Sequence, residues 1–148
     1  MMYEKTASTI IAELDAVLRR LDDGQIEAFI GEILKAKRIV LIGVGREGLS
    51  TRAFTMRLMH MGLDSHWVWD ETTPALRPGD LLIATSGCGK IGHIHYVCER
   101  AKANGARIVV LDPRHSELAG WGEWIPIKSA GDLAFLLAVA NVLITEGI

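Results

Sequence analysis

The sequence of 148 residues contains only two cysteines and four prolines, and aromatic residues make up 6% of it. The cysteines, Cys88 and Cys98, have no CxxC spacing, which excludes a disulfide-stapled scaffold and favours a reducing compartment. The longest apolar run, residues 133–144, is shorter than the roughly 18 residues that cross a bilayer, so it predicts a buried helix. The first residues lack the positive-then-apolar pattern of a signal peptide. We therefore expect a cytoplasmic protein that contacts no membrane.

Charge of neither sign dominates the chain. Sixteen Lys and Arg residues face 18 Asp and Glu residues, for a net charge of −2, and no block or stripe of like charge occurs. This balance excludes nucleic acid as the main partner. Apolar residues make up 49% of the chain. A surplus of apolar residues on a small domain more often forms a subunit interface.

The order of apolar patterns predicts one α/β domain over residues 1–148. No repeat or proline-rich linker divides the chain, and its length is typical of a single domain. We expect N-terminal helices in residues 2–36 and an α/β core in residues 37–148. Helical spacing covers residues 2–22, 26–36, 48–61, 90–104 and 131–145, and apolar β-rich runs cover residues 38–42, 66–69, 80–84, 107–111 and 124–127.

Strand–helix alternation of this kind implies a parallel sheet with helices on both faces. The fold class is therefore α/β, a doubly wound five-stranded parallel sheet in a flavodoxin-like, three-layer αβα arrangement. Pro126 places the last strand at an edge, because proline cannot donate to a sheet ladder. Gly105 is predicted to end the helix over residues 90–104 in the left-handed conformation.

Two glycine-bearing loops follow the first and third predicted strands. Loop one is Gly43–Gly48 and loop two is Thr85–Lys90, and each opens a helix. Ligands of parallel sheets bind beyond the carboxyl ends of the strands, where strand order reverses. Glycine allows a close backbone approach, and N–H groups of such loops and helix starts bind phosphate. The loops therefore predict one anion site, with the alternative that their glycines only close tight turns.

A dinucleotide site is the main rival for loop one. Gly43, Gly45 and Gly48 have the GxGxxG spacing, and Asp70 follows 22 positions later, where a ribose-binding acid belongs. Arg46 stands inside the loop, however, where a pyrophosphate loop usually has small residues. A dinucleotide site would also leave loop two, the second glycine-bearing loop, without a role.

Four segments resemble 6-phospho-3-hexuloisomerases of the sugar isomerase (SIS) domain family. They are residues 43–49 (GVGREGL), 54–62 (FTMRLMHMG), 71–75 (ETTPA) and 79–87 (GDLLIATSG), and the likeness extends over residues 36–115. The resemblance implies an SIS-type five-stranded doubly wound sheet and a homodimer or homotetramer with sites near subunit boundaries. It also implies a phosphorylated sugar as ligand, with metal-free and cofactor-free proton transfer through an enediol that interconverts a 3-ketohexose 6-phosphate and fructose 6-phosphate.

Isomerisation needs a base that takes a proton from carbon and returns it to the neighbouring carbon. The resemblance assigns this role to His60, whose alternative is a histidine that caps the end of its helix. Glu71 leaves the second strand at its carboxyl end and is the second catalytic candidate, with a solvated turn acid as the alternative. The residues expected to bind the phosphate or substrate are Gly45, Arg46, Glu47, Thr85, Ser86, Gly87, Cys88, Gly89 and Lys90.

The chain departs from the family pattern in both loops. Glu47 replaces a serine of the first loop, and Cys88 and Lys90 replace a serine and an acid of the second. Glu47 is either a base, if the phosphate lies wholly on loop two, or a helix cap or partner of Arg46. These departures motivate an alternative function, a non-catalytic SIS protein that binds or senses a phosphosugar. His93 and His95 lie on different sides of their helix and predict no zinc site.

Overall fold

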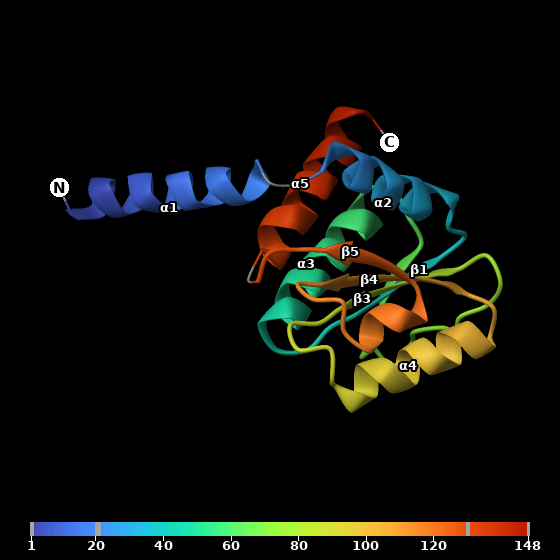
Figure 1. Ribbon diagram of the computed structural model, residues 1–148. Helices are drawn as coiled ribbons and strands as arrows, with labels where there is room; N and C mark the ends of the chain where they lie inside the picture. Colours follow the sequence, from blue (N-terminus) through green and yellow to red (C-terminus); the bar gives the residue numbers. More distant parts are fainter. Residues whose placement is uncertain (1, 20–21, 130, 148) are drawn as a thin grey trace.

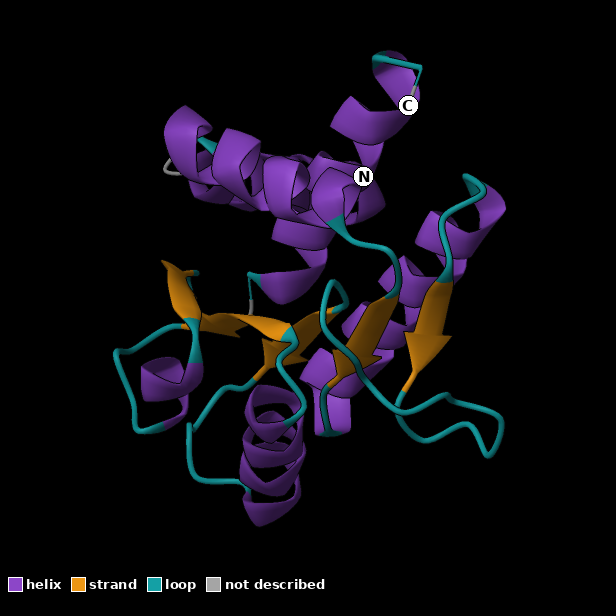
Figure 2. Ribbon diagram, turned by 90° about the vertical axis from the view of Figure 1, so that its right-hand side faces the viewer, coloured by secondary structure: helices purple, strands orange, loops and turns teal. Residues whose placement is uncertain are grey.

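The computed structural model describes residues 2–19, 22–129 and 131–147, which contain a five-stranded parallel sheet with helices on both faces (Figures 1 and 2). The strand order is β2-β1-β3-β4-β5, and every neighbouring pair is parallel. The predicted fold class is confirmed. The strands are β1 (Ile39–Ile42), β2 (Ser65–Trp67), β3 (Leu81–Thr85), β4 (Arg107–Asp112) and β5 (Glu123–Pro126), and the helices are α1 (Met2–Leu18), α2 (Asp23–Lys35), α3 (Gly45–His60), α4 (Gly92–Ala103), the 3-10 helix η1 (Leu118–Trp121) and α5 (Asp132–Thr145).

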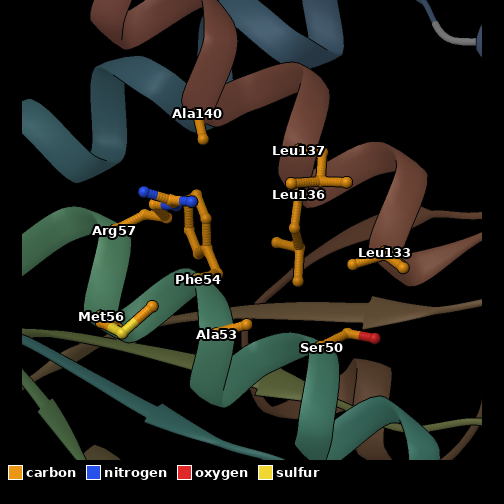
Figure 3. Close-up of a pocket in the computed structure, with 9 residues that line it drawn as sticks. All are labelled: Ser50, Ala53, Phe54, Met56, Arg57, Leu133, Leu136, Leu137 and Ala140. Carbon is orange, nitrogen blue, oxygen red and sulfur yellow. The ribbon is translucent and has the colours of Figure 1, made fainter.

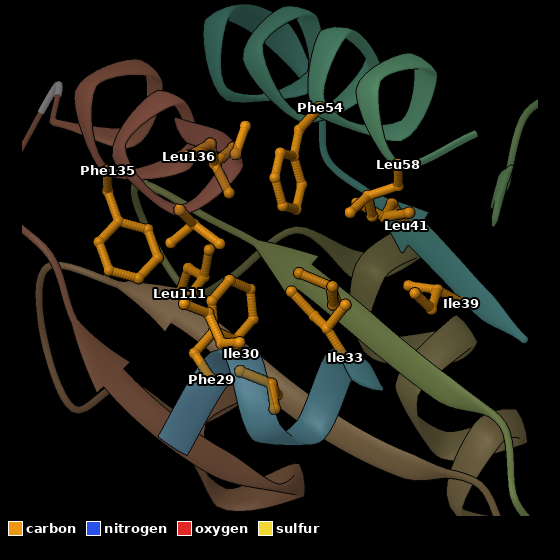
Figure 4. Close-up of a cluster of buried hydrophobic side chains, with 14 of the residues drawn as sticks. Phe29, Ile30, Ile33, Ile39, Leu41, Phe54, Leu58, Leu111, Phe135 and Leu136 are labelled. Carbon is orange, nitrogen blue, oxygen red and sulfur yellow. The ribbon is translucent and has the colours of Figure 1, made fainter. Parts of the chain in front are cut away.

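Successive side chains of each strand point to opposite faces and divide the interior into two cores. One core lies between the sheet and helices α2, α3 and α5, with Phe29, Leu41 and Phe135 at its centre (Figure 4). The other lies against α4 and η1 and includes Ile42 and Cys98. Burial raises the pKa of the Cys98 thiol to about 12, so this cysteine is an inert core residue.

Element boundaries follow local chemistry. Strands β1 and β3 are buried along their whole length, as their continuous apolar runs predict. Gly105, at φ +77°, follows the end of α4 as the predicted left-handed residue. Helix α3 begins at Gly45 rather than at the predicted Gly48, because most of loop one forms the first helical turn. Strand β5 lies at the edge of the sheet, as predicted, and runs from Glu123 to Pro126 rather than over residues 124–127.

Helix α2 begins at Asp23, three residues before the predicted start at Ile26. The carboxylate of Asp22 accepts a hydrogen bond from the Gln25 N–H at 3.0 Å and caps the helix. Residues 23–25, which the prediction leaves between the two N-terminal helices, therefore belong to the first turn of α2.

Replacement of Asp22 by alanine should lower the free energy of unfolding by about 1 kcal/mol, because an N–H of the first turn loses its acceptor. Urea unfolding at a fixed protein concentration measures the change. Glu27→Ala removes an exposed acid from the middle of the same helix and should change the value by less than about 0.5 kcal/mol. Equal losses in the two variants would contradict the capping role of Asp22.

Helix α1 extends away from the rest of the molecule (Figure 1). None of its described side chains is buried. The sequence predicts a helix over residues 2–22; the helix ends at Leu18, and residues 20 and 21 of the prediction lie outside the described residues. Among the helices of the described residues, none is long and apolar enough to cross a membrane.

Candidate functional site

Loops one and two lie side by side at the carboxyl edge of the sheet, because β1 and β3 are paired neighbours with Ile42 opposite Ala84. A side chain at Gly43 would collide with the Thr85 hydroxyl, and one at Gly48 would lie 2.9 Å from the Gly43 carbonyl oxygen. Both glycines therefore close the strand-to-helix turn tightly. Gly45, at φ +62°, is exposed, and a Cβ atom there would lie 3.7 Å from Oε2 of Glu47.

A buried chain of hydroxyl groups joins the two loops. Thr85 and Thr51 lie 2.7 Å apart through their Oγ1 atoms, and Thr51 donates to the Glu47 carbonyl oxygen at 2.6 Å. Both threonines are fully buried. Thr85 was expected to contact the ligand, but its hydroxyl is buried, where it bonds to Thr51 and donates to the Ile42 carbonyl oxygen at 3.3 Å. The structure therefore places Thr85 behind the site, where it fixes loop one against loop two.

Loop two is held in shape by its own side chains and by α4. The buried Ser86 hydroxyl accepts a hydrogen bond from the Gly89 N–H at 2.8 Å. Trp121 donates to Nδ1 of His95 at 3.1 Å, which leaves the other ring nitrogen, Nε2, to donate to the Gly89 carbonyl oxygen at 2.9 Å. Ser86 was expected to contact the phosphate, but its hydroxyl is used to close the loop, and His95 has a similar bracing role.

The outward side of loop two remains available for an anion. Cys88 and Lys90 are exposed, and the N–H groups of Gly87, Cys88 and Lys90 have no acceptor among the described residues. Arg114 lies beside the loop and donates to the Cys88 carbonyl oxygen at 3.3 Å. Loop two thus combines free N–H groups with two cationic side chains, a combination suited to a phosphate.

The Glu47 side chain reaches across from loop one to loop two. A Cβ atom at Gly87 would lie 2.5 Å from Glu47 Oε1, so the carboxylate lies directly over that glycine. In the described part of the chain Glu47 forms no ion pair with Arg46, contrary to one sequence hypothesis. The expectation of one anion held between the two loops therefore needs correction, because the Glu47 carboxylate occupies that space.

Asp132, the first residue of α5, is the site residue that sequence reasoning missed. It lines a pocket of about 140 Å³ with Arg46, Glu47, Ser50 and Leu133, and it is only 7% exposed. Burial raises the pKa of Asp132, and the carboxylates of Glu47 and Asp112 add to this shift, whereas its own backbone and Arg46 oppose it. The sequence signal that could have found Asp132 is an acidic residue at the start of a helix. This helix follows β5, at the edge of the sheet that also carries loops one and two.

The two predicted catalytic residues have different locations. Glu71 is exposed in the turn after β2, at the same edge of the sheet as the loops. His60 is the exposed last residue of α3, and the length of that helix places it about 22 Å from Gly45. A single chain therefore does not bring His60 to loops one and two.

Trp69 forms one wall beside loop one. Its indole N–H donates to the Gly43 carbonyl oxygen at 3.4 Å, and its ring meets the edge of His93 at 5.8 Å between centroids. Asp70, the ribose-binding candidate of the dinucleotide alternative, instead faces Arg52 at 3.7 Å. Across the described ranges, no group of three or more His, Cys, Asp or Glu side chains could hold a metal ion.

Comparisons with known proteins converge on one family, although no family model matches the chain. A 3-hexulose-6-phosphate isomerase from Mycobacterium gastri is 36% identical over 124 residues, which are 83% of this chain and 62% of that protein. A crystal structure from Methanococcus jannaschii, with an inferred function of 3-hexulose-6-phosphate isomerase, has a TM-score of 0.85 and 28% identity, and the match covers 95% of this chain and 90% of that one.

More distant structures share the fold. The Vibrio vulnificus NanR protein, complexed with ManNAc-6P, has a TM-score of 0.82 at 19% identity, and the match covers 99% of this chain and 63% of that one. The chain spans about half to three fifths of the length of the curated relatives it matches. The chain is therefore a member of the SIS domain family and is similar to the 3-hexulose-6-phosphate isomerases.

Proposed function

We propose that the chain catalyses a metal-free shift of a carbonyl group along a hexose 6-phosphate, between the 3-keto sugar and fructose 6-phosphate. The observation that carries the proposal is a pair of neighbouring carboxylates, Glu47 and Asp132, beside a loop of free N–H groups at one edge of the sheet. The names of the relatives support the substrate class.

The phosphate binds to the outward side of loop two. The N–H groups of Gly87, Cys88 and Lys90 and the start of α4 donate to its oxygens, and the side chains of Lys90 and Arg114 supply positive charge. This location keeps the phosphate away from the Glu47 carboxylate, because the two would repel each other between the loops. A complex of one structural neighbour with ManNAc-6P supports a phosphosugar as ligand.

Glu47 and Asp132 carry out the proton transfer. The carboxylate that is ionised takes the proton from the carbon next to the carbonyl group and returns it to the former carbonyl carbon, after the enediol has formed. The raised pKa of Asp132 favours its protonated form, and Asp132 gives a proton to the carbonyl oxygen as the enediol forms and takes one from the neighbouring hydroxyl group as the new carbonyl forms. Arg46, which lines the same pocket, limits the repulsion between the two acids.

His60 and Glu71 remain candidates within a homodimer or homotetramer in the cytoplasm. Because α3 carries His60 away from its own loops, only a second subunit can bring that imidazole to a site. His60→Ala should leave turnover unchanged if Glu47 and Asp132 suffice, and should abolish it if the histidine is supplied between subunits.

Lys90→Ala should raise KM for the sugar phosphate about tenfold with little change in kcat, because a charged hydrogen bond to the phosphate is lost in both ground and transition states. Steady-state kinetics at low ionic strength separates the two constants, since salt screens this exposed charge. Lys35→Ala removes the same charge from an exposed position in the last turn of α2, just before β1 begins, and should leave KM unchanged. A fall in kcat alone would contradict phosphate binding by Lys90.

Formation of fructose 6-phosphate from the 3-keto isomer by the purified protein tests the proposal directly. Thermal unfolding with the same sugar phosphates tests the alternative, a non-catalytic protein that senses a phosphosugar. A ligand at a hundredfold excess over its Kd stabilises the folded state by about 2.7 kcal/mol. Stabilisation without turnover would favour the sensing alternative, which the position of Glu47 between the loops also favours. Neither turnover nor stabilisation would overturn both functions.

A further inference from the structure

The peptide bond between Gly89 and Lys90 in loop two is oriented by His95 of α4. The Gly89 carbonyl oxygen accepts a hydrogen bond from Nε2 of His95 at 2.9 Å. Because this peptide bond is trans, the Lys90 N–H points in the opposite direction, away from His95. That N–H has no acceptor among the described residues. The direction in which it is offered to a ligand therefore depends on the bond from His95.

Gly89 cannot fix this peptide bond by itself. Its φ is +66°, and glycine adopts many backbone conformations at little cost. A Cβ atom at Gly89 would collide with Ser116, so no larger residue can stiffen the loop at this position. The peptide bond before Gly89 is fixed at both ends, because its N–H donates to the Ser86 hydroxyl at 2.8 Å and its carbonyl oxygen accepts from Arg114 at 3.3 Å. The peptide bond after Gly89 needs a contact from outside the loop.

The His95 ring makes that contact only with its proton on Nε2. Trp121 of η1 donates its indole N–H to Nδ1 of His95 at 3.1 Å, and an indole N–H cannot accept a hydrogen bond. Nδ1 is therefore an acceptor without a proton, and the proton of the neutral ring lies on Nε2, which donates to the Gly89 carbonyl oxygen. The Trp121 ring is itself held by Lys102, whose Nζ lies 5.5 Å from the ring centroid. The contacts on both ring nitrogens thus select the same form of the histidine.

We propose that His95 is a positioning residue of the anion site and that Trp121 keeps it in the required form. The inference deepens the proposed function and rests on the binding of a phosphate to loop two. His95 does not touch the phosphate but holds the Lys90 N–H toward it through the peptide bond after Gly89. Cys88 offers only a thiol, a weak donor, where the family pattern has a serine hydroxyl. Phosphate binding therefore depends more strongly on the direction of the backbone N–H groups.

Nitrogen-15 NMR spectroscopy of the full chain tests the form of the histidine without any ligand. At neutral pH, His95 should have a proton on Nε2 and none on Nδ1, and the signals that disappear in His95→Gln identify the ring. Trp121→Phe removes the donor to Nδ1 and should let the ring populate both neutral forms. A proton on Nδ1 of His95 in the wild type would overturn the proposal.

Calorimetric titration with inorganic phosphate and with fructose 6-phosphate tests the effect on the site. His95→Leu should raise Kd for both by about tenfold, because the Lys90 N–H is no longer held toward the anion. His95→Gln should return Kd to within about threefold of the wild-type value, because its side-chain amide can also donate to the Gly89 carbonyl oxygen. Tyr96→Leu changes the exposed neighbour on the same helix and should leave Kd unchanged.

Leu136→Ala separates positioning from general destabilisation. Leu136 lines an apolar pocket of about 130 Å³ between α3 and α5, on the opposite face of the sheet from α4 (Figure 3). This variant should lower the thermal unfolding temperature, because it opens a cavity in the core, without changing Kd for inorganic phosphate. Equal losses of affinity in Leu136→Ala and His95→Leu would overturn the proposal.

The binding experiment also separates this inference from the proposed function. Phosphate binding that is equally strong in the wild type and in His95→Leu, or a loss that His95→Gln does not restore, would overturn the positioning role alone. A wild-type chain that binds no phosphate would overturn the site on loop two as well. Binding with the expected losses but without turnover of the sugar phosphate would support the positioning role and end the proposed isomerase activity.

Discussion

Asp132→Asn should reduce kcat for the carbonyl shift by about 10²- to 10⁴-fold, the usual contribution of a positioned acid or base. The asparagine keeps the shape of the side chain but cannot take up or release a proton. Because Asp132 lies in a pocket with Glu47 and Arg46 rather than on loop two, KM should change much less than kcat. Steady-state kinetics of the purified variant with the 3-keto sugar phosphate gives both constants.

Glu146→Gln provides the matched control, because it removes an exposed acid immediately after the other end of α5. This variant should retain full activity. Wild-type activity in Asp132→Asn would remove Asp132 from the mechanism and return the proton transfer to Glu47, or to Glu71 and His60.

The raised pKa of Asp132 has consequences for both stability and activity. A carboxyl group with a pKa higher in the folded than in the unfolded state binds more protons when folded, so its contribution to stability falls as pH rises through that interval. Asp132→Asn should therefore keep or increase stability at neutral pH while it lowers activity, so a simple folding defect cannot explain the loss.

Glu47→Gln removes a neighbouring negative charge and should shift the pKa of Asp132 back toward its ordinary value.

The sequence predicts the fold well because burial on both sides leaves a strong pattern. Continuous apolar runs mark β1, β3 and β4, and Pro126 identifies the edge strand. Boundaries near the loops are predicted less well, since the start of α3 depends on how Gly45 turns and the start of α2 on the Asp22 cap. Those details arise from single hydrogen bonds and backbone angles, to which apolar periodicity is insensitive.

The candidate site is only partly predictable, because spacing along the chain does not specify side-chain direction. Loops one and two are neighbours because β1 and β3 are adjacent strands, as in the flavodoxin-like arrangement that the sequence predicts. The inward direction of Thr85 and Ser86 and the reach of Glu47 over Gly87 depend on tertiary packing. Asp132 comes from a distant part of the chain and carries no local motif, so only the fold brings it to the site.

Phe29→Ala should lower the free energy of unfolding by about 3–5 kcal/mol, because it opens a cavity in a core that has no solvent access at this position. The Phe29 ring of α2 packs on Phe135 of α5 at 5.5 Å between centroids, and Phe135 is three residues beyond Asp132. Loss of this contact should also loosen α5 and its first turn. Urea unfolding should therefore show a large loss for Phe29→Ala and less than about 0.5 kcal/mol for Leu34→Ala, a truncation at an exposed position of α2. Similar losses in both variants would mean that α2 does not brace α5, and the position of Asp132 would then have to depend on the contacts of α5 with α3 alone.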